Sequence, residues 1–116
     1  MKAFNHCKSS VRHFGGLELD YHEIHAWFDE SKSHWSDYRH RELRHHTIGV
    51  ILCEKEFGIY IINSENKKVP VKSIAEQHIR EDLGFIPSLQ DWFKEITPRS
   101  WMASTRRVVK KKMNLM

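Results

Sequence analysis

Apolar residues recur at helical spacing along most of this chain, and a glycine or proline closes most of the segments in which they do so. In residues 3–14 the apolar positions are three or four apart: Phe4, Cys7, Val11 and Phe14. This spacing places them on one face of a helix, and Gly15-Gly16 is a typical helix stop. Similar patterns predict four more helices: 21–29 capped by Asp20, Ser33 or Ser36 to Phe57, 73–82 capped by Ser73, and 89–96.

The segment between the third and fourth of these helices has the composition of a β-hairpin. Residues 59–62 and 69–71 are rich in β-branched side chains, and the residues between them are polar. A lone hairpin is only marginally stable, so it must pack on the helices. Gly49, inside the third helix, indicates close packing or a kink there. We therefore predict a mainly α fold: a single compact helical domain of four to five helices with a small inserted β-hairpin.

The positive charge is concentrated at the C-terminal end of the sequence. The 116 residues include 19 Lys+Arg and 15 Asp+Glu. Six of the basic residues and none of the acidic ones fall in 98–116, so residues 1–97 hold 13 basic and 15 acidic residues, a net charge of −2. We therefore divide the chain into a His-rich helical domain, 1–102, and a basic tail, 103–116, which we expect to be flexible.

Several classes of protein are excluded by the apolar runs and the cysteines. The longest apolar run, Ile48–Cys53, is far shorter than the ~20 residues that cross a bilayer. The N-terminal residues lack the apolar stretch of a signal peptide. Cys7 and Cys53 have no C-x-x-C spacing, as is typical of reduced cytosolic thiols. We expect a cytoplasmic protein without a membrane partner, and its oligomeric state is not predicted.

Histidine is strongly over-represented, with nine residues in the chain and eight of them within the first 46. Imidazole nitrogens and carboxylate oxygens are the donors that Zn²⁺, Mn²⁺ and Fe²⁺ use in hydrolases and oxygenases. His22 and His25 are three apart, and such a pair can point two ligands into a helical bundle. His78 stands four residues before Asp82, which could orient its ring. The candidate ligands of a divalent metal are His22, His25, His40, His46, Glu54 and His78.

The candidate catalytic residues lie in the segment 37–46 and are Arg39, Arg41 and His45. A guanidinium binds phosphate oxygens in a fork, and an imidazole moves a proton near neutral pH. A bound metal would lower the pKa of a water molecule beside them. These features predict a metal-dependent hydrolase that acts on a phosphoester or a nucleotide-like substrate.

Other interpretations stay open. Arg41 and His46 fit the loose Arg-x(4–6)-His pattern of HEPN-type ribonucleases, which would cleave RNA without a metal. The same segment also fits a solvated charged helix face, and clustered histidines fit a pH-sensitive interface. A non-enzymatic nucleic-acid or ribonucleoprotein-binding module is a further alternative, because the basic tail could bind phosphate backbones. Its candidate residues are Arg106, Arg107, Lys110, Lys111 and Lys112.

Several strings of the sequence resemble those of an uncharacterised family of small His-rich proteins from bacteria and their phages. They are His-Ala-Trp-Phe-Asp-Glu-Ser-Lys (25–32), Asp-Tyr-Arg-His-Arg-Glu-Leu-Arg-His-His (37–46), Val-Pro-Val-Lys-Ser-Ile-Ala-Glu-Gln-His-Ile-Arg-Glu-Asp-Leu-Gly (69–84), Ile-Pro-Ser-Leu-Gln-Asp-Trp (86–92) and Trp-Met (101–102). The resemblance covers about residues 4–102 and implies that they form one unit, in a cytoplasmic setting in bacteria or in phage-infected cells. It carries no catalytic role to any residue.

Overall fold

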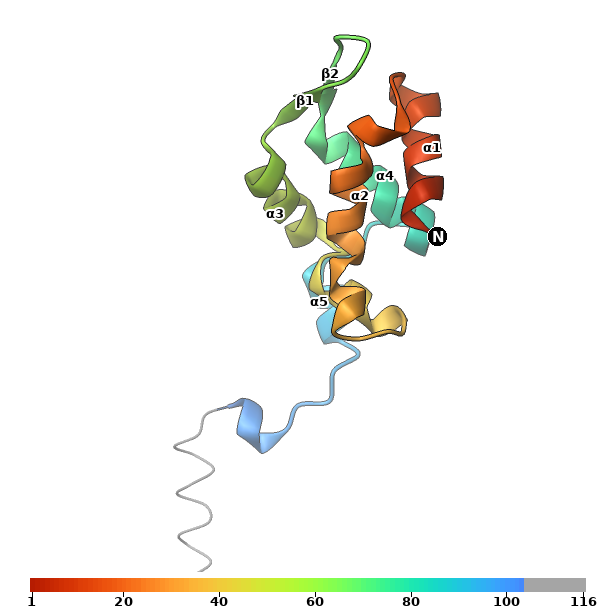
Figure 1. The fold of residues 1–116 in the computed structure, drawn as a ribbon. Helices are drawn as coiled ribbons and strands as arrows, with labels where there is room; N and C mark the ends of the chain where they lie inside the picture. The colour runs from red at the N-terminus through yellow and green to blue at the C-terminus, as the bar shows by residue number, and fades with distance from the viewer. Residues whose placement is uncertain (104–116) are drawn as a thin grey trace, which may run out of the picture.

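A computed structural model describes residues 1–103 of the chain (Figure 1). Its regular elements are α1 (Ala3–Phe14), α2 (His22–Asp29), α3 (Thr47–Phe57), β1 (Tyr60–Ile62), β2 (Lys68–Pro70), α4 (Val71–Leu83) and α5 (Leu89–Phe93). Four short 3₁₀ helices join or follow them: Glu18–Asp20, Glu30–Ser33, Tyr38–Leu43 and Ser100–Met102. The predicted mainly α class with a small hairpin is confirmed. Among the described residues, no helix is long and apolar enough to cross a membrane.

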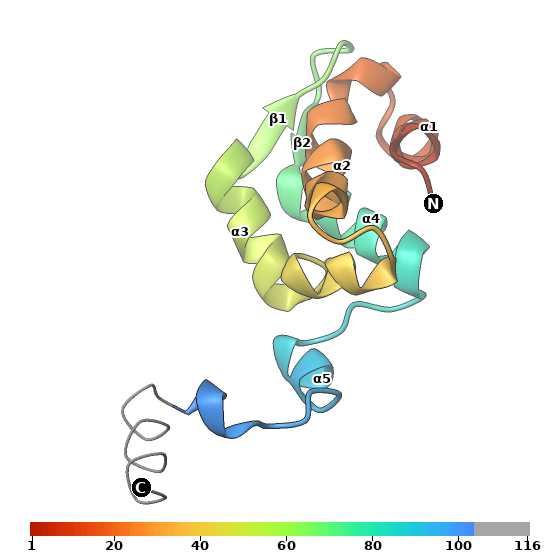
Figure 2. The ribbon, with the colours of Figure 1, turned by 60° about the horizontal axis from the view of Figure 1, so that its bottom comes forward.

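Helix α2 lies in the middle of the bundle, with α1, α3 and α4 around it (Figures 1 and 2). Helix α4 packs against α1, α2 and α3, so residues distant in sequence meet along its buried side. The antiparallel hairpin pairs Ile61 with Val69 and runs directly into α4. The core consists of Tyr21, Ile24, Phe28, Val50, Cys53, Val69, Val71, Ile74, Ala75 and Ile79. On the predicted apolar face of α1, Phe4 is exposed, while Val11 and Phe14 pack against this core.

The prediction of one long helix from Ser33 or Ser36 to Phe57 is wrong. Residues 38–43 form a 3₁₀ helix, and α3 begins only at Thr47. His46 is extended (φ −163°, ψ 175°), and its Nδ1 accepts a hydrogen bond from the backbone N–H of Gly49. A Cβ on Gly49 would lie 1.7 Å from the carbonyl oxygen of Arg44, so the close packing predicted at this glycine is confirmed. The break turns the chain back towards the bundle between Asp37 and His46.

Other predicted boundaries shift by a few residues. Helix α4 begins at Val71, two residues before the expected cap Ser73, because the hairpin leads straight into its first turn. Asp20 does not cap α2, since its carboxylate accepts hydrogen bonds from the backbone N–H groups of Leu17 and Ser64. Helix α5 ends at Phe93 and not at Ile96. Beyond α4 the chain leads away from the bundle towards α5 (Figure 2).

Candidate metal centre

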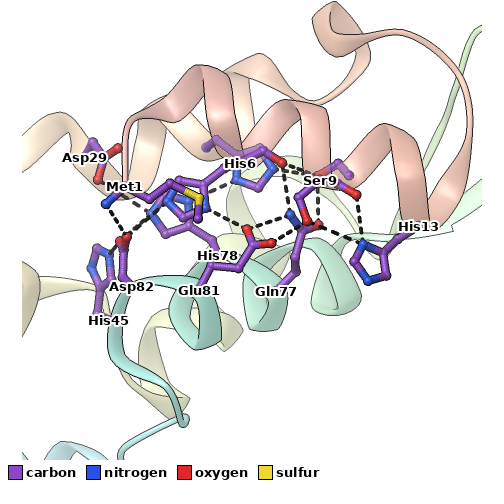
Figure 3. Close-up of polar contacts among 12 residues, drawn as sticks. Met1, His6, Ser9, His13, Asp29, His45, Gln77, His78, Glu81 and Asp82 are labelled. Atoms are coloured by element: carbon purple, nitrogen blue, oxygen red, sulfur yellow. Dashed lines mark hydrogen bonds and ion pairs between the residues drawn. The ribbon is translucent and has the colours of Figure 1, made fainter.

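Burial divides the nine histidines into two groups. The rings exposed to solvent are those of His13, His22 and His34. The buried ones are His6, His25, His40, His45, His46 and His78, although histidine is not a typical core residue. The rings of His6, His45 and His78 surround one carboxylate, Asp82 (Figure 3). His25 lies beside His78, and His40 lies beside a second carboxylate, Asp29. A polar centre therefore lies inside this small bundle.

Asp82 is the hub of this centre, and its side chain is only 1% exposed. Its Oδ2 lies 2.9 Å from Nε2 of His45 and 3.2 Å from Nε2 of His78. Its Oδ1 lies 3.1 Å from Nε2 of His6 and 3.7 Å from Nη2 of Arg41. His78 and Asp82 are one turn apart on α4, so they share a helix face, as their spacing predicts.

Asp29 supplies the second carboxylate, from the last residue of α2. Its Oδ1 lies 3.5 Å from Nε2 of His78 and 4.0 Å from Nε2 of His40. Its side chain is 13% exposed, so it forms the more open side of the centre. Two buried carboxylates this close to the same imidazole require positive charge nearby, because an uncompensated buried charge is costly.

The ring of His40 has a defined orientation and a defined tautomer. Its Nδ1 lies 2.7 Å from the backbone carbonyl oxygen of Asp37, which can only accept, so Nδ1 carries the hydrogen and donates it. Nε2 of the neutral ring then has a free lone pair. This atom is buried, has no hydrogen-bond partner among the described residues, and is directed towards Asp29. A backbone-anchored imidazole of this kind is typical of metal ligands.

Nε2 of His78 is also buried and forms no hydrogen bond within residues 1–103, although it faces both carboxylates. Asp29, His45, His78 and Asp82 each offer one ligand atom, and these atoms lie within 4.8 Å of one another. In a tetrahedral site with bonds of ~2.0–2.1 Å, ligand atoms stand about 3.3 Å apart. The distances between the ligand atoms of His45, His78, Asp29 and Asp82 that are given above, 2.9 to 3.5 Å, lie on both sides of 3.3 Å. A second group with the same property, His6, His25 and His78, shares His78. These buried groups could hold a metal ion.

The electrostatics of the centre follow from burial and these contacts. Burial alone would raise the pKa of Asp82, but contacts with His45, His6 and His78 hold this pKa far below its usual range. Burial lowers the pKa of His25 to about 2, helped by the neighbouring His78 and His6, so this ring stays neutral. Burial would also lower the pKa of His78, yet Asp29 and Asp82 raise it. The pKa of Asp29 is lowered as well, so both carboxylates are ionised. The N-terminal ammonium of Met1 lies 3.1 Å from Oδ1 of Asp82, and the side of the centre that faces Asp29 attracts further positive charge.

A shell of polar side chains surrounds the rings. Both nitrogens of His6 face carboxylates, Nδ1 lying 2.8 Å from Oε1 of Glu81. The His6 ring stacks on that of His78 with centroids 3.8 Å apart, and Phe28 stacks on His78 at 4.7 Å. Glu81 also accepts hydrogen bonds from Ser9 and Gln77 (Figure 3). The rings are therefore held by packing as well as by hydrogen bonds.

The structure brings together part of the set predicted from the sequence. His25 and His78 belong to the centre, and His40 lies beside its carboxylate Asp29. His45 also belongs to the centre: the sequence suggests it as a catalytic residue, and here it lies among the groups that could hold a metal ion. Arg41 borders the centre through Asp82, while Arg39 is paired with Asp37 on the surface.

The remaining predicted ligands are not brought to the centre. His22 is exposed on α2, and Glu54 lies on α3, partly exposed. His46 is buried but serves as the N-cap of α3, so its Nδ1 is engaged by Gly49. Because α3 begins only at Thr47, Glu54 lies on a different element from His40 and His45. Arg106, Arg107, Lys110, Lys111 and Lys112 lie outside the described residues.

Sequence reasoning missed the role of three residues. Asp82 is expected only to orient His78, and Asp29 and His6 are not among the predicted ligands, whereas the two carboxylates form the charged middle of the centre. The i, i+4 spacing of His78 and Asp82 was the available signal. No comparable signal joins His6 or Asp29 to them, since these residues come from other helices.

No curated protein and no solved structure matches the chain significantly. A family model does match it, over residues 1–102, and confirms the resemblance to an uncharacterised family drawn from the sequence. The chain therefore belongs to the family described as Domain of unknown function (DUF6915).

Proposed function

We propose that the chain binds one divalent metal ion through Asp29, His40, His45, His78 and Asp82. The observation that carries this proposal is the pair of buried, unpartnered Nε2 atoms of His40 and His78, both directed at ionised carboxylates. Lone pairs facing carboxylate oxygens repel one another unless a cation lies between them. A metal ion among Asp29, His45, His78 and Asp82 would satisfy Nε2 of His78 and both carboxylates, and Nε2 of His40, 4.0 Å from Asp29, is a further donor at the edge of this group.

The donor set favours Zn²⁺, Mn²⁺ or Fe²⁺. Mixed imidazole nitrogen and carboxylate oxygen suits these ions, and the described cysteines are not part of the set: Cys53 lies in the core and Cys7 on α1. The five donors come from α2, from α4 and from the segment 40–45 before α3. An ion held by these residues would lower the pKa of a water molecule beside it.

We further propose that this water hydrolyses a phosphoester in a small molecule or nucleic acid. Arg41 supports this step: its Nε is a buried donor without a hydrogen-bond partner in residues 1–103, and its Nη2 lies beside Asp82. A guanidinium with unused donors at the edge of a metal centre suits a phosphate group. A cavity of about 320 Å³ on the neighbouring surface is lined by Arg39 and His40.

Metal content tests the first proposal. Protein prepared without a His-tag and incubated with Zn²⁺, Mn²⁺ or Fe²⁺ is expected to retain about one equivalent after gel filtration. His40→Ala should weaken binding, because it removes one donor at the edge of the centre. His22→Ala is the matched control, since it removes an exposed histidine that the centre does not use. Less than ~0.2 equivalents with every ion, in protein shown to be folded, would overturn the proposal.

Hydrolysis needs its own test. Metal-loaded protein is expected to cleave bis-p-nitrophenyl phosphate, and a chelator should abolish the reaction. Arg41→Ala should slow the reaction while retaining the metal, and Arg41→Lys should restore it only in part, because Lys cannot form the two-pronged contact. If the metal-loaded protein releases no nitrophenol from mono- or diesters, the proposed hydrolysis is refuted and the proposed metal binding is not.

A further inference from the structure

We propose that Gln77, Ser10 and His25 form a directional hydrogen-bond relay that holds the hydrogen of His78 on Nδ1 and thereby presents its Nε2 to the metal. These three are positioning residues, and their effect on metal affinity rests on the proposed metal-binding function. All three are buried, as is His78. The direction of the relay follows from which atoms can donate.

The first step is the orientation of the Gln77 amide. Its Nε2 lies 3.0 Å from the backbone carbonyl oxygen of His6 and 2.9 Å from Oε1 of Glu81. Both partners are acceptors, so the NH₂ group must face them. The amide oxygen Oε1 is then on the other side, 2.8 Å from Oγ of Ser10.

The second step is the hydroxyl of Ser10. Two oxygens only 2.8 Å apart need a hydrogen between them, and Oε1 of Gln77 has none. The same hydroxyl lies 3.1 Å from the backbone carbonyl oxygen of His6, which can also only accept, so the single hydrogen of Ser10 is directed at these two oxygens. Nε2 of His25 lies 2.7 Å from the same Oγ. Since the hydroxyl hydrogen is already used, His25 must donate from Nε2 and Ser10 must accept.

The third step determines which nitrogen of His78 carries the hydrogen. Nδ1 of His25 lies 2.9 Å from Nδ1 of His78. A neutral His25 with its hydrogen on Nε2 has a lone pair on Nδ1, so His78 must donate from its own Nδ1. The remaining nitrogen of His78, Nε2, faces Asp29 and Asp82. The relay thus selects the ring nitrogen that can bind the metal.

His40 and His78 reach the same tautomer by different means. His40 lies in a turn, where the carbonyl of Asp37 is free to accept from Nδ1. His78 lies in the middle of α4, where backbone carbonyls are already used in the helix. The acceptor has to come from another element, and α2 supplies it as His25, held in turn by Ser10 on α1. Outer partners of this kind typically change metal affinity by 10- to 100-fold when they are lost.

The tautomers can be read in the metal-free full chain by ¹⁵N–¹H correlation spectra of histidine-labelled protein at pH 8. We expect His78 to carry a hydrogen on Nδ1, and His25 to carry its hydrogen on Nε2 and none on Nδ1. A His78 ring with unprotonated Nδ1 would overturn the inference. Because no metal is present, this result is independent of metal binding. If the tautomers are as expected but the chain does not bind Zn²⁺, the proposed function is refuted and the relay is not.

Variants of Ser10 test the effect on the metal. Ser10→Ala removes the acceptor for His25, so Zn²⁺ affinity should fall by about 10- to 100-fold, and part of the His25 population should move its hydrogen to Nδ1. Ser10→Thr keeps a hydroxyl and should restore both readouts. Ser9→Ala is the matched control, since the neighbouring hydroxyl donates to Glu81 and not to the relay. Ser10→Ala with unchanged tautomers and unchanged Zn²⁺ affinity in a folded chain would contradict the inference.

Discussion

His78 and Asp82 face each other across one turn of α4, with Nε2 of the imidazole 3.2 Å from Oδ2 of the carboxylate. The same carboxylate contacts His45 and His6, which come from the segment before α3 and from α1. One buried charge thus joins three parts of the chain, and replacing it should affect both stability and binding.

Asp82→Asn keeps the shape of this side chain and removes its charge. We expect metal binding to be lost, and the free energy of unfolding to fall by ~3 kcal/mol, because the surrounding imidazoles lose a buried partner. Denaturant unfolding of the metal-free protein measures the second effect. Glu30→Gln is the control: this carboxylate is 67% exposed, and its loss should change the free energy of unfolding by less than ~0.5 kcal/mol. Equal unfolding midpoints for the two variants would contradict the central role of Asp82.

Exchanging His40 or His46 for alanine should separate binding from folding. His40→Ala is expected to weaken metal binding, since Nε2 of this ring is a proposed donor. His46→Ala should leave binding nearly intact and lower the free energy of unfolding by ~1 kcal/mol, because it removes the N-cap of α3. Isothermal titration with Zn²⁺ and denaturant unfolding measure the two effects. The opposite pattern would place His46, not His40, at the centre.

Metal removal should lower the melting temperature in a pH-dependent way. An ion present at 100 times its dissociation constant stabilises the native state by ~2.7 kcal/mol. Protons compete with the metal for imidazole nitrogen, so the difference in melting temperature between loaded and chelated protein should shrink as pH falls from 8 to 5. Differential scanning calorimetry with and without a chelator measures it. A difference that grows towards pH 5 would be incompatible with imidazole ligands.

Cys53 should be unreactive in the native protein. Burial raises the pKa of its thiol to about 12, so at pH 8 only about one molecule in ten thousand carries the thiolate that reacts. Burial also raises the pKa of Cys7. Labelling with 5,5′-dithiobis(2-nitrobenzoate) should be slow in buffer and should reach both cysteines in guanidinium chloride. Rapid labelling of native protein would contradict the packing of α3 against the core.

The raised pKa of Cys53 also has a consequence for stability at high pH. The folded chain holds the thiol proton more tightly than the unfolded chain, whose ordinary pKa is near 9. The contribution of this group is therefore complete below pH 9 and is lost as the pH rises from about 9 towards about 12. Cys53→Ala should remove that part of the alkaline loss when unfolding is followed over this range.

Gly49→Ala should destabilise the chain although alanine is the better helix former. The added Cβ would lie 1.7 Å from the carbonyl oxygen of Arg44, a backbone atom that cannot move without shifting His45. We expect a loss of more than ~2 kcal/mol in the free energy of unfolding, against a gain in helix propensity of ~1 kcal/mol. Gly84→Ala is the comparison, because nothing lies within 4 Å of its Cβ position and only its positive φ opposes alanine. A stabilised Gly49→Ala would show that the break before α3 is not held by this contact.

Local pattern determined a large part of the fold. The position of α1 follows from the spacing of apolar residues in 3–14, because a helix buries one face. The ends of α1, α3 and α4 follow from the glycines after Phe14, Phe57 and Leu83, because glycine adopts the positive φ at which a helix ends. The pairing of His78 with Asp82 also follows from sequence spacing, since residues four apart on a helix are neighbours.

Only the tertiary structure decided which histidines share a centre. The residues 33–57 read as one periodic helix, and nothing local reveals that Gly49 packs on Arg44 and that His46 caps a new helix. That break directs His40 and His45 inwards and leaves Glu54 outside the centre. The partnership of His6, Asp29 and Asp82 joins three helices across up to 76 positions of sequence. Spacing along a chain determines neighbours within one helix, whereas the distance between helices is set by how their apolar faces pack, and the polar atoms of this centre are brought together as a result of that packing.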